Sequence, residues 1–234
     1  MSTIIRWDQA RWDITYSFDA LSSFLDTMEA QLEEVRRLEG ARLQAEYDSF
    51  KSKDQKDYAF FMADYEDEVQ AQKHRLDVMF PRILRYSLAT QLFMLIETNF
   101  DAVCDEIAKR RKLRLRSRDF RGALFDRVKL FMNAAASLPL VYDKSWQDLT
   151  KLQKVRDCIA HVGGKIEESR DHEYLRKLIV EHQDVAGPDE DGRLELERTF
   201  CIKMIAASKS AFNQIFETAG FGPAQPTFET KTTS

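Results

Sequence analysis

The chain has 234 residues, a formal net charge of −4 at pH 7, and only 8 glycines and 5 prolines. This composition is typical of a mainly helical protein, and the length allows a sizeable core. Three scattered cysteines argue against a disulfide framework or a zinc site, and no apolar run reaches the roughly 18 residues of a membrane span. The first residues lack the pattern of a signal peptide, so we expect a cytoplasmic protein without membrane contact.

Residues 18–38 place apolar side chains at steps of mostly three and four, the pattern of an amphipathic helix with a coiled-coil-like seam. After a polar interruption at 51–56, the pattern resumes over 58–76. We therefore predict a helical extension over residues 1–78, either a hairpin of two helices or one long broken helix. It could pack on the remainder of the chain or on a second copy.

A more apolar helix is predicted to open at Phe80-Pro81, because proline is tolerated in a first helical turn. Its apolar positions recur as far as Ile107, so we expect it at the centre of the fold. Ten basic and only two acidic residues follow over 109–129, a local excess of positive charge in an acidic chain. The second half of this stretch carries a short apolar-periodic helix.

The next predicted helix covers 146–162 and begins near Ser145, which with Asp148 resembles a capping box. It ends before Gly163-Gly164, a pair that tolerates the left-handed conformation of a helix stop.

Beyond it, the pattern predicts a short helix over 174–179, a β-hairpin around the turn 187–192 and a last helix that ends near Gly220. Residues 221–234 lack a pattern, and we expect them to form a mobile tail.

The helix before Gly163-Gly164 carries Arg156 and His161. A fixed cation near a side chain that titrates close to neutral pH suits phosphodiester chemistry. A similar spacing recurs at Arg176 and His182, but in a short polar segment that we interpret as surface.

The run Arg156-Asp157-Cys158-Ile159-Ala160-His161 resembles the Arg-x4-His signature of HEPN domains. Upstream, Tyr86-Ser87-Leu88 and the run 95–100, which contains Glu97, resemble the second helix of prokaryotic HEPN proteins. The resemblance implies a helical bundle that forms a homodimer with its two motifs facing each other. Many members of the family are metal-independent endoribonucleases, often toxins or antiviral effectors, and others are non-catalytic modules.

The sequence thus predicts an all-α fold. It comprises a HEPN-like helical bundle over 79–220, a long-helix, coiled-coil-like extension over 1–78, a small β-hairpin near the C-terminus, and the tail 221–234. We identify no residue pattern for a metal ion or a cofactor. The expected partners are RNA, a second copy of the chain, and an antitoxin or defence-system protein.

The proposed reaction is attack of a ribose 2′-hydroxyl on the adjacent phosphate, which leaves a 2′,3′-cyclic phosphate. His161 would transfer protons and Arg156 would stabilise phosphate charge, with Asp157 and Glu97 orienting them. Five helical steps separate Arg156 from His161 by about 140° and about 7.5 Å. Both side chains could act on one phosphate only where two copies meet. Alternatively, His161 caps the helix, Arg156 and Asp157 form a surface ion pair, and Glu97 is structural.

The basic stretch is predicted to track RNA phosphates. Its RNA-binding residues are Lys109, Arg110, Arg111, Lys112, Arg114, Arg116, Arg118 and Arg121. Alternatively, the stretch is a solvated loop that balances acidic residues of the N-terminal extension. A second function also stays open, namely a non-catalytic HEPN-like interaction or oligomerisation module that binds a protein or nucleotide partner.

Overall fold

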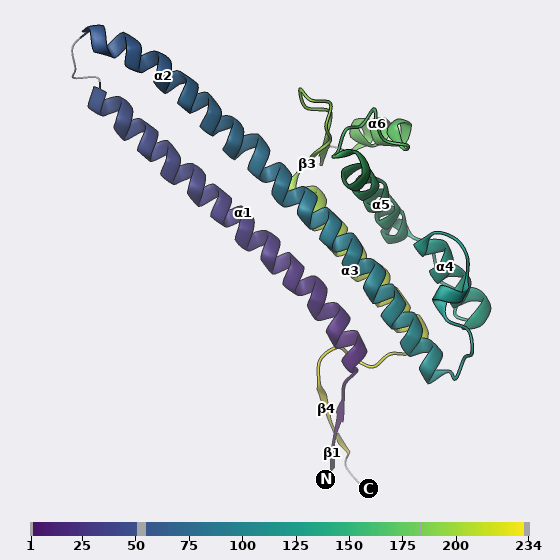
Figure 1. Ribbon diagram of the computed structural model, residues 1–234. Helices are drawn as coiled ribbons and strands as arrows, with labels where there is room; N and C mark the ends of the chain where they lie inside the picture. Colours follow the sequence, from purple (N-terminus) through teal and green to yellow (C-terminus); the bar gives the residue numbers. More distant parts are fainter. Residues whose placement is uncertain (1, 51–54, 183, 232–234) are drawn as a thin grey trace. The chain divides into compact units, whose positions relative to one another are not determined.

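The computed structural model of the protein describes residues 2–50, 55–182 and 184–231, and it is mostly helical (Figure 1). In chain order the elements are β1 (Ser2–Arg6), α1 (Gln9–Phe50), α2 (Gln55–His74), α3 (Phe80–Arg110), α4 (Leu124–Leu130), α5 (Lys144–Val162), α6 (His172–Glu181), β2 (Val185–Ala186), β3 (Glu195–Leu196), α7 (Arg198–Ala219) and β4 (Thr227–Lys231). The predicted all-α class is therefore confirmed. Within these described ranges, no helix combines the length and the apolar character needed to cross a bilayer.

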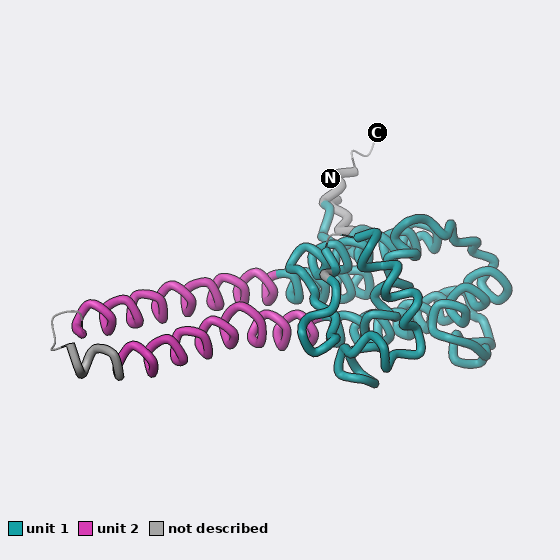
Figure 2. Tube along the Cα trace, turned by 90° about the horizontal axis from the view of Figure 1, so that it is seen from above, with its two compact units in different colours: residues 1–22, 89–234 teal, residues 23–88 magenta. Residues whose placement is uncertain are grey.

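The chain divides into two units, which Figure 2 colours separately. Unit 1 comprises Met1–Ser22 and Ala89–Ser234, and unit 2 comprises residues 23–88. The sequence predicts a boundary at residue 78, whereas the observed boundaries fall inside α1 and α3. The apolar periodicity of both helices continues across these boundaries, so the sequence pattern gives no sign of them.

Unit 2 is a hairpin of antiparallel helical segments (Figure 2), one of the two arrangements that the sequence left open. Arg36 donates a hydrogen bond to the carbonyl oxygen of Leu76 at 2.9 Å, and the Tyr65 hydroxyl donates to the carbonyl oxygen of Leu43 at 3.1 Å. At the far end of the hairpin, the rings of Phe50 and Phe61 stack. These contacts hold α1 against α2 and against the residues that directly follow α2.

The predicted break at Phe80-Pro81 is a π-helical turn, Arg75–Met79, through which α2 passes into α3. Proline has no N–H to donate to the preceding turn, so the regular hydrogen-bond ladder cannot continue through Pro81. The N–H of Phe80 bonds instead to the carbonyl oxygen of Arg75, five residues back. The helix absorbs the proline by widening for one turn rather than by ending.

The core of unit 1 is built on α3, as expected from its apolar sequence. Phe100 of α3 stacks on Trp146 of α5 at a ring-centroid distance of 5.4 Å and on Phe212 of α7 at 4.5 Å. All three rings are fully buried. Large aromatic side chains contribute most to core burial, so this stack fixes α5, which carries the Arg-x4-His motif, against α3 and α7.

Two short strand pairs complete unit 1. β2 pairs with β3 in antiparallel register, with Val185 opposite Leu196, at the place where the sequence predicts a β-hairpin. β1 pairs with β4, so the two ends of the chain lie side by side (Figure 1). The predicted patternless tail 221–234 therefore contains a strand. Its partner lies more than 200 residues away in the sequence, which local pattern analysis cannot detect.

Candidate functional site

Helix α5 presents the motif because both of its ends are fixed. At its N-terminus, the Asp143 carboxylate accepts a hydrogen bond from the N–H of Ser145 at 2.9 Å. The cap is thus Asp143 and not the predicted Ser145, which lies two residues farther along the chain, inside the helix. At the C-terminus, Gly163 adopts a left-handed conformation with φ of 62°, as the sequence predicts.

Arg156 lies between α5 and α3. Its guanidinium carbon is 4.0 Å from the centroid of the Phe93 ring, and its Nη1 is 2.9 Å from Oδ1 of Asp157. Its Nη2 is 3.6 Å from Oε1 of Glu97. The structure therefore brings together three of the four predicted catalytic residues. The Arg156 side chain is only 20% exposed, and its Nε has no hydrogen-bond partner among the described residues.

The fourth residue, His161, lies on a different surface of α5. It is exposed and lines a depression of about 240 Å³ whose other walls include Asp157, Ser169, Arg170 and Asp171. Arg156 does not line this depression. Asp157 is thus the link between the two parts of the motif, because it pairs with Arg156 and also borders the space beside His161.

Part of the basic segment after α3 is neutralised inside the molecule. Arg110 forms ion pairs with Asp8 at 2.7 Å and with Glu106 at 2.8 Å. Arg116 and Arg118 both pair with Asp105, at 3.3 Å and 2.7 Å. These three predicted RNA-binding residues therefore hold the segment against α1 and α3.

The other five predicted RNA-binding residues differ in their surroundings. Arg111 donates to the carbonyl oxygen of Ala136 at 2.9 Å, and Lys109 lies 3.9 Å from Glu106. A further three are exposed and make no ion pair with any described residue: Lys112, Arg114 and Arg121. The free positive charge is therefore smaller than the sequence indicates.

The carboxylate of Asp8 is the buried anchor of this region. Burial by itself would raise the pKa of Asp8. Hydrogen bonds from the Arg110 guanidinium and from the N–H groups of Arg11 and Gly222 outweigh burial and lower its pKa below the ordinary value. Asp8 thereby joins the start of α1, the end of α3 and the segment after α7.

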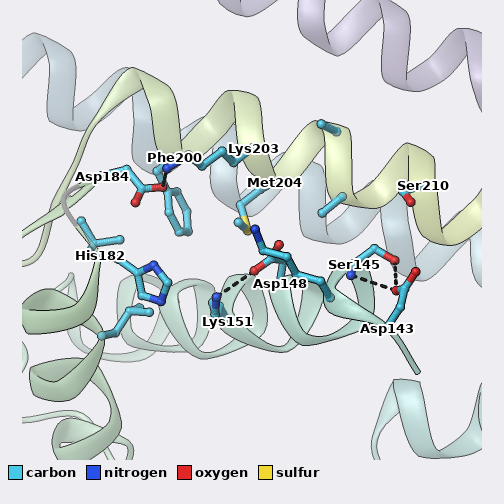
Figure 3. Close-up of a pocket in the computed structure, with 15 residues that line it drawn as sticks. Asp143, Ser145, Asp148, Lys151, His182, Asp184, Phe200, Lys203, Met204 and Ser210 are labelled. Carbon is cyan, nitrogen blue, oxygen red and sulfur yellow. Dashed lines mark hydrogen bonds and ion pairs between the residues drawn. The ribbon is translucent and has the colours of Figure 1, made fainter. Parts of the chain in front are cut away.

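A second cavity, of about 420 Å³, lies among α5, α6 and α7 (Figure 3). Four of its charged groups form two ion pairs, Lys151 with Asp148 at 2.8 Å and Lys203 with Asp184 at 3.1 Å. His182 also lines it and is half-buried, so our interpretation of His182 as surface is corrected. Sequence patterns do not reveal this cavity, because its lining residues come from three separate helices and the segments beside them.

Cysteine and metal-ligand chemistry has little support in the described part of the chain. Cys104, Cys158 and Cys201 are all buried, and none of the three forms a disulfide bond. Burial raises the pKa of the Cys104 thiol to about 12, which disfavours the reactive thiolate. Across residues 2–50, 55–182 and 184–231, no group of three His, Cys, Asp or Glu side chains is arranged to hold a metal ion.

Comparisons with known protein families, with curated proteins and with solved structures find no match to this chain. The resemblance to HEPN domains therefore rests on the motif in α5 and its helical surroundings.

Proposed function

We propose that the protein is an endoribonuclease that cleaves RNA without a metal ion, with Arg156 and His161 of α5 as its central groups. The observation that carries the proposal is the position of Asp157. Its carboxylate pairs with Arg156 and borders the depression that His161 also lines, so one acid lies between the two parts of the motif. A phosphodiester in this depression would meet the imidazole of His161 and the carboxylate of Asp157 from the same copy.

In the proposed reaction, the ribose 2′-oxygen attacks the adjacent phosphorus and the bond to the 5′-oxygen of the next nucleotide breaks. His161 removes the 2′-hydroxyl proton or protonates the leaving 5′-oxygen. Arg156 stabilises the charge on the phosphate oxygens, a task suited to a planar guanidinium. The products are a 2′,3′-cyclic phosphate and a 5′-hydroxyl.

The reaction needs two copies of the chain. Within one copy, Arg156 faces Phe93 and Glu97, whereas His161 lines a separate depression. A composite site takes Arg156 from one copy and His161 from the other, and a two-fold axis supplies two such sites. Phosphate binding would also draw Arg156 away from Glu97, whose contact is already long at 3.6 Å.

The test is incubation of the full chain with single-stranded and structured RNA in EDTA, followed by analysis of the RNA ends. Matched DNA of the same sequence serves as the substrate control, because it lacks the 2′-hydroxyl. We expect cyclic phosphate ends on RNA and intact DNA. Cleavage of both polymers, or RNA fragments with 5′-phosphate ends, would refute the proposed chemistry.

A second candidate function is a non-catalytic interaction module. It is favoured by the enclosure of Arg156, which a purely structural ion pair on the Phe93 ring would also explain. In that case Arg156→Ala lowers the stability of unit 1, and RNA stays intact with every variant. A role as a toxin or antiviral effector, with an antitoxin or defence-system partner, belongs to the first candidate function only.

A further inference from the structure

Unit 2 carries an apolar groove that its own residues leave open. The groove has a volume of about 460 Å³ and lies between α1 and the start of α3. Its walls include Phe24, Met28 and Val35 from α1, and Phe80 and Ile83 from α3. These five side chains are all exposed, from 37% for Met28 to 58% for Ile83.

The groove matters for the stability of unit 2, because unit 2 buries few apolar side chains. Among its described residues, the buried apolar side chains, proline aside, are four leucines: Leu25, Leu32, Leu76 and Leu88. Most helical stability in proteins comes from packing an amphipathic face, not from helix propensity. A hairpin of two helices packs only the side that faces its neighbour. The groove side gains the same stabilisation only when another surface covers it.

We infer that the surface covering this groove is the same groove of a second copy of the chain. In a two-fold interface each surface patch contacts the same patch of the other copy. A charged patch would therefore face a patch of the same charge. The polar residues that line the groove are Gln31 and Ser87, both uncharged, although unit 2 is rich in charged residues. Nearby, Glu29 and Arg85 neutralise each other at 2.9 Å.

The exposed area is of the size that such an interface needs. Aromatic side chains offer roughly 150–250 Å² each and the aliphatic ones somewhat less. Since about 40–60% of each is exposed, the five walls together present roughly 400 Å² on one copy. Soluble monomers rarely expose a contiguous apolar patch larger than a few hundred Å². Two copies would bury roughly 800 Å² of apolar surface, and a polar rim brings the total past the roughly 1,000 Å² of a specific interface.

The paired hairpins would form a four-helix assembly, a common solution for amphipathic helices with one unpacked side. This inference goes beyond the proposed function and does not depend on it, since a non-catalytic module could dimerise in the same way. If the protein is a nuclease, the groove supplies the second copy that the composite site requires. The dimer interface would then lie in unit 2, whereas the Arg-x4-His motif belongs to unit 1.

The experiment is sedimentation equilibrium of the full-length protein and three variants. Ile83→Asp and Val35→Asp each place a carboxylate in the groove, on α3 and on α1. Val180→Asp is the matched control, because Val180 lies on α6 in unit 1 and is 86% exposed. Circular dichroism checks that each variant keeps its helical content, and both groove positions are exposed enough to accept the change.

We expect a wild-type dimer whose dissociation constant rises at least about 30-fold in both groove variants, the effect of losing an interface hot spot, and does not change in Val180→Asp. A monomeric wild-type protein overturns the inference. A dimer unaffected by Ile83→Asp and Val35→Asp overturns it too, because another surface then holds the copies together. A dimer that both groove variants leave intact overturns the inference alone, and a dimer held by the groove that leaves RNA intact overturns the proposed nuclease alone, so the two can fail separately.

Discussion

Asp157 Oδ1 lies 2.9 Å from Nη1 of Arg156, the residue before it on α5. Consecutive helical residues point about 100° apart, so this contact bends two side chains toward each other across the surface of α5. The pair reaches from the α3 side of the helix to the depression beside His161. The chemistry that we propose depends on this link, and so does the first prediction.

Asp157→Asn tests whether the pair is functional or structural. Both side chains are only about one-fifth exposed, but asparagine keeps the size of aspartate and an oxygen that still accepts a hydrogen bond from Arg156. We therefore expect little change in the free energy of unfolding. If the protein is a nuclease, Asp157→Asn should shift the pH profile of cleavage, because the negative charge of the Asp157 carboxylate is lost from the site. An unchanged profile would remove Asp157 from the site.

Phe93→Leu tests the support beneath Arg156. The ring of Phe93 is fully buried, packs edge-on against Phe125 and lies under the guanidinium at 4.0 Å. Leucine fills part of the volume but offers no aromatic face, so the cation–π contribution of about 0.5–2 kcal/mol is lost. We expect urea denaturation to show a loss of about 1–2 kcal/mol. Leu92→Ile, a buried apolar change beside it, is the control for general repacking.

Asp8→Asn should destabilise unit 1 and make its free energy of unfolding depend less on pH in the acid range. Asp8 accepts hydrogen bonds from Arg110 and from two backbone N–H groups, and bonds to a charged group contribute about 1.5–3 kcal/mol each. Because the folded pKa of Asp8 is lowered, its stabilisation is present above the unfolded pKa of about 4. It is lost as the pH falls through the lower folded value.

The measurement for Asp8 is urea denaturation of both proteins from neutral pH down to acid pH. Wild type should lose more stability than Asp8→Asn below about pH 4, where the carboxylate becomes protonated. Equal losses in the two proteins would show that Asp8 is not the anchor of this region.

If the basic segment binds RNA, its exposed and unpaired arginines should contribute most of the affinity. Arg114 and Arg121 make no ion pair in the described part of the chain. Replacing both with alanine should weaken binding and reduce the salt dependence of log K by about 1.4, since each single-stranded phosphate contact contributes about 0.7. Lys177→Ala, on α6 beside Glu181, is the control. An unchanged salt dependence would assign the segment to structure alone.

The sequence predicts well those features that depend on local pattern. The periodic stripe and the following glycine pair define α5 and its left-handed end at Gly163. The apolar density of α3 identifies the core helix, whose Phe100 stacks on two others. The motif residues Arg156, Asp157 and Glu97 are neighbours in the structure as well.

Features that depend on distant partners could not be predicted. The basic segment looks uniformly free in the sequence, yet Asp105 on the preceding helix neutralises Arg116 and Arg118. Nothing local links β1 to β4. At Pro81, the sequence shows the missing N–H but not that a π-helical turn can absorb it. For the basic segment and for β1, the deciding contact comes from another element of the chain, which the periodicity of a single segment does not reveal.

The most direct test of the composite site mixes two inactive variants. Arg156→Ala and His161→Ala should each lose RNA cleavage by about 10²-fold or more as purified dimers. After subunit exchange, about half of the dimers contain one copy of each variant, and one of their two sites combines an intact Arg156 with an intact His161.

We predict that the exchanged mixture recovers about a quarter of wild-type activity, whereas His74→Ala, an exposed histidine of unit 2, keeps full activity. Cleavage that stays absent after exchange, or that either single variant retains in full, would contradict the account.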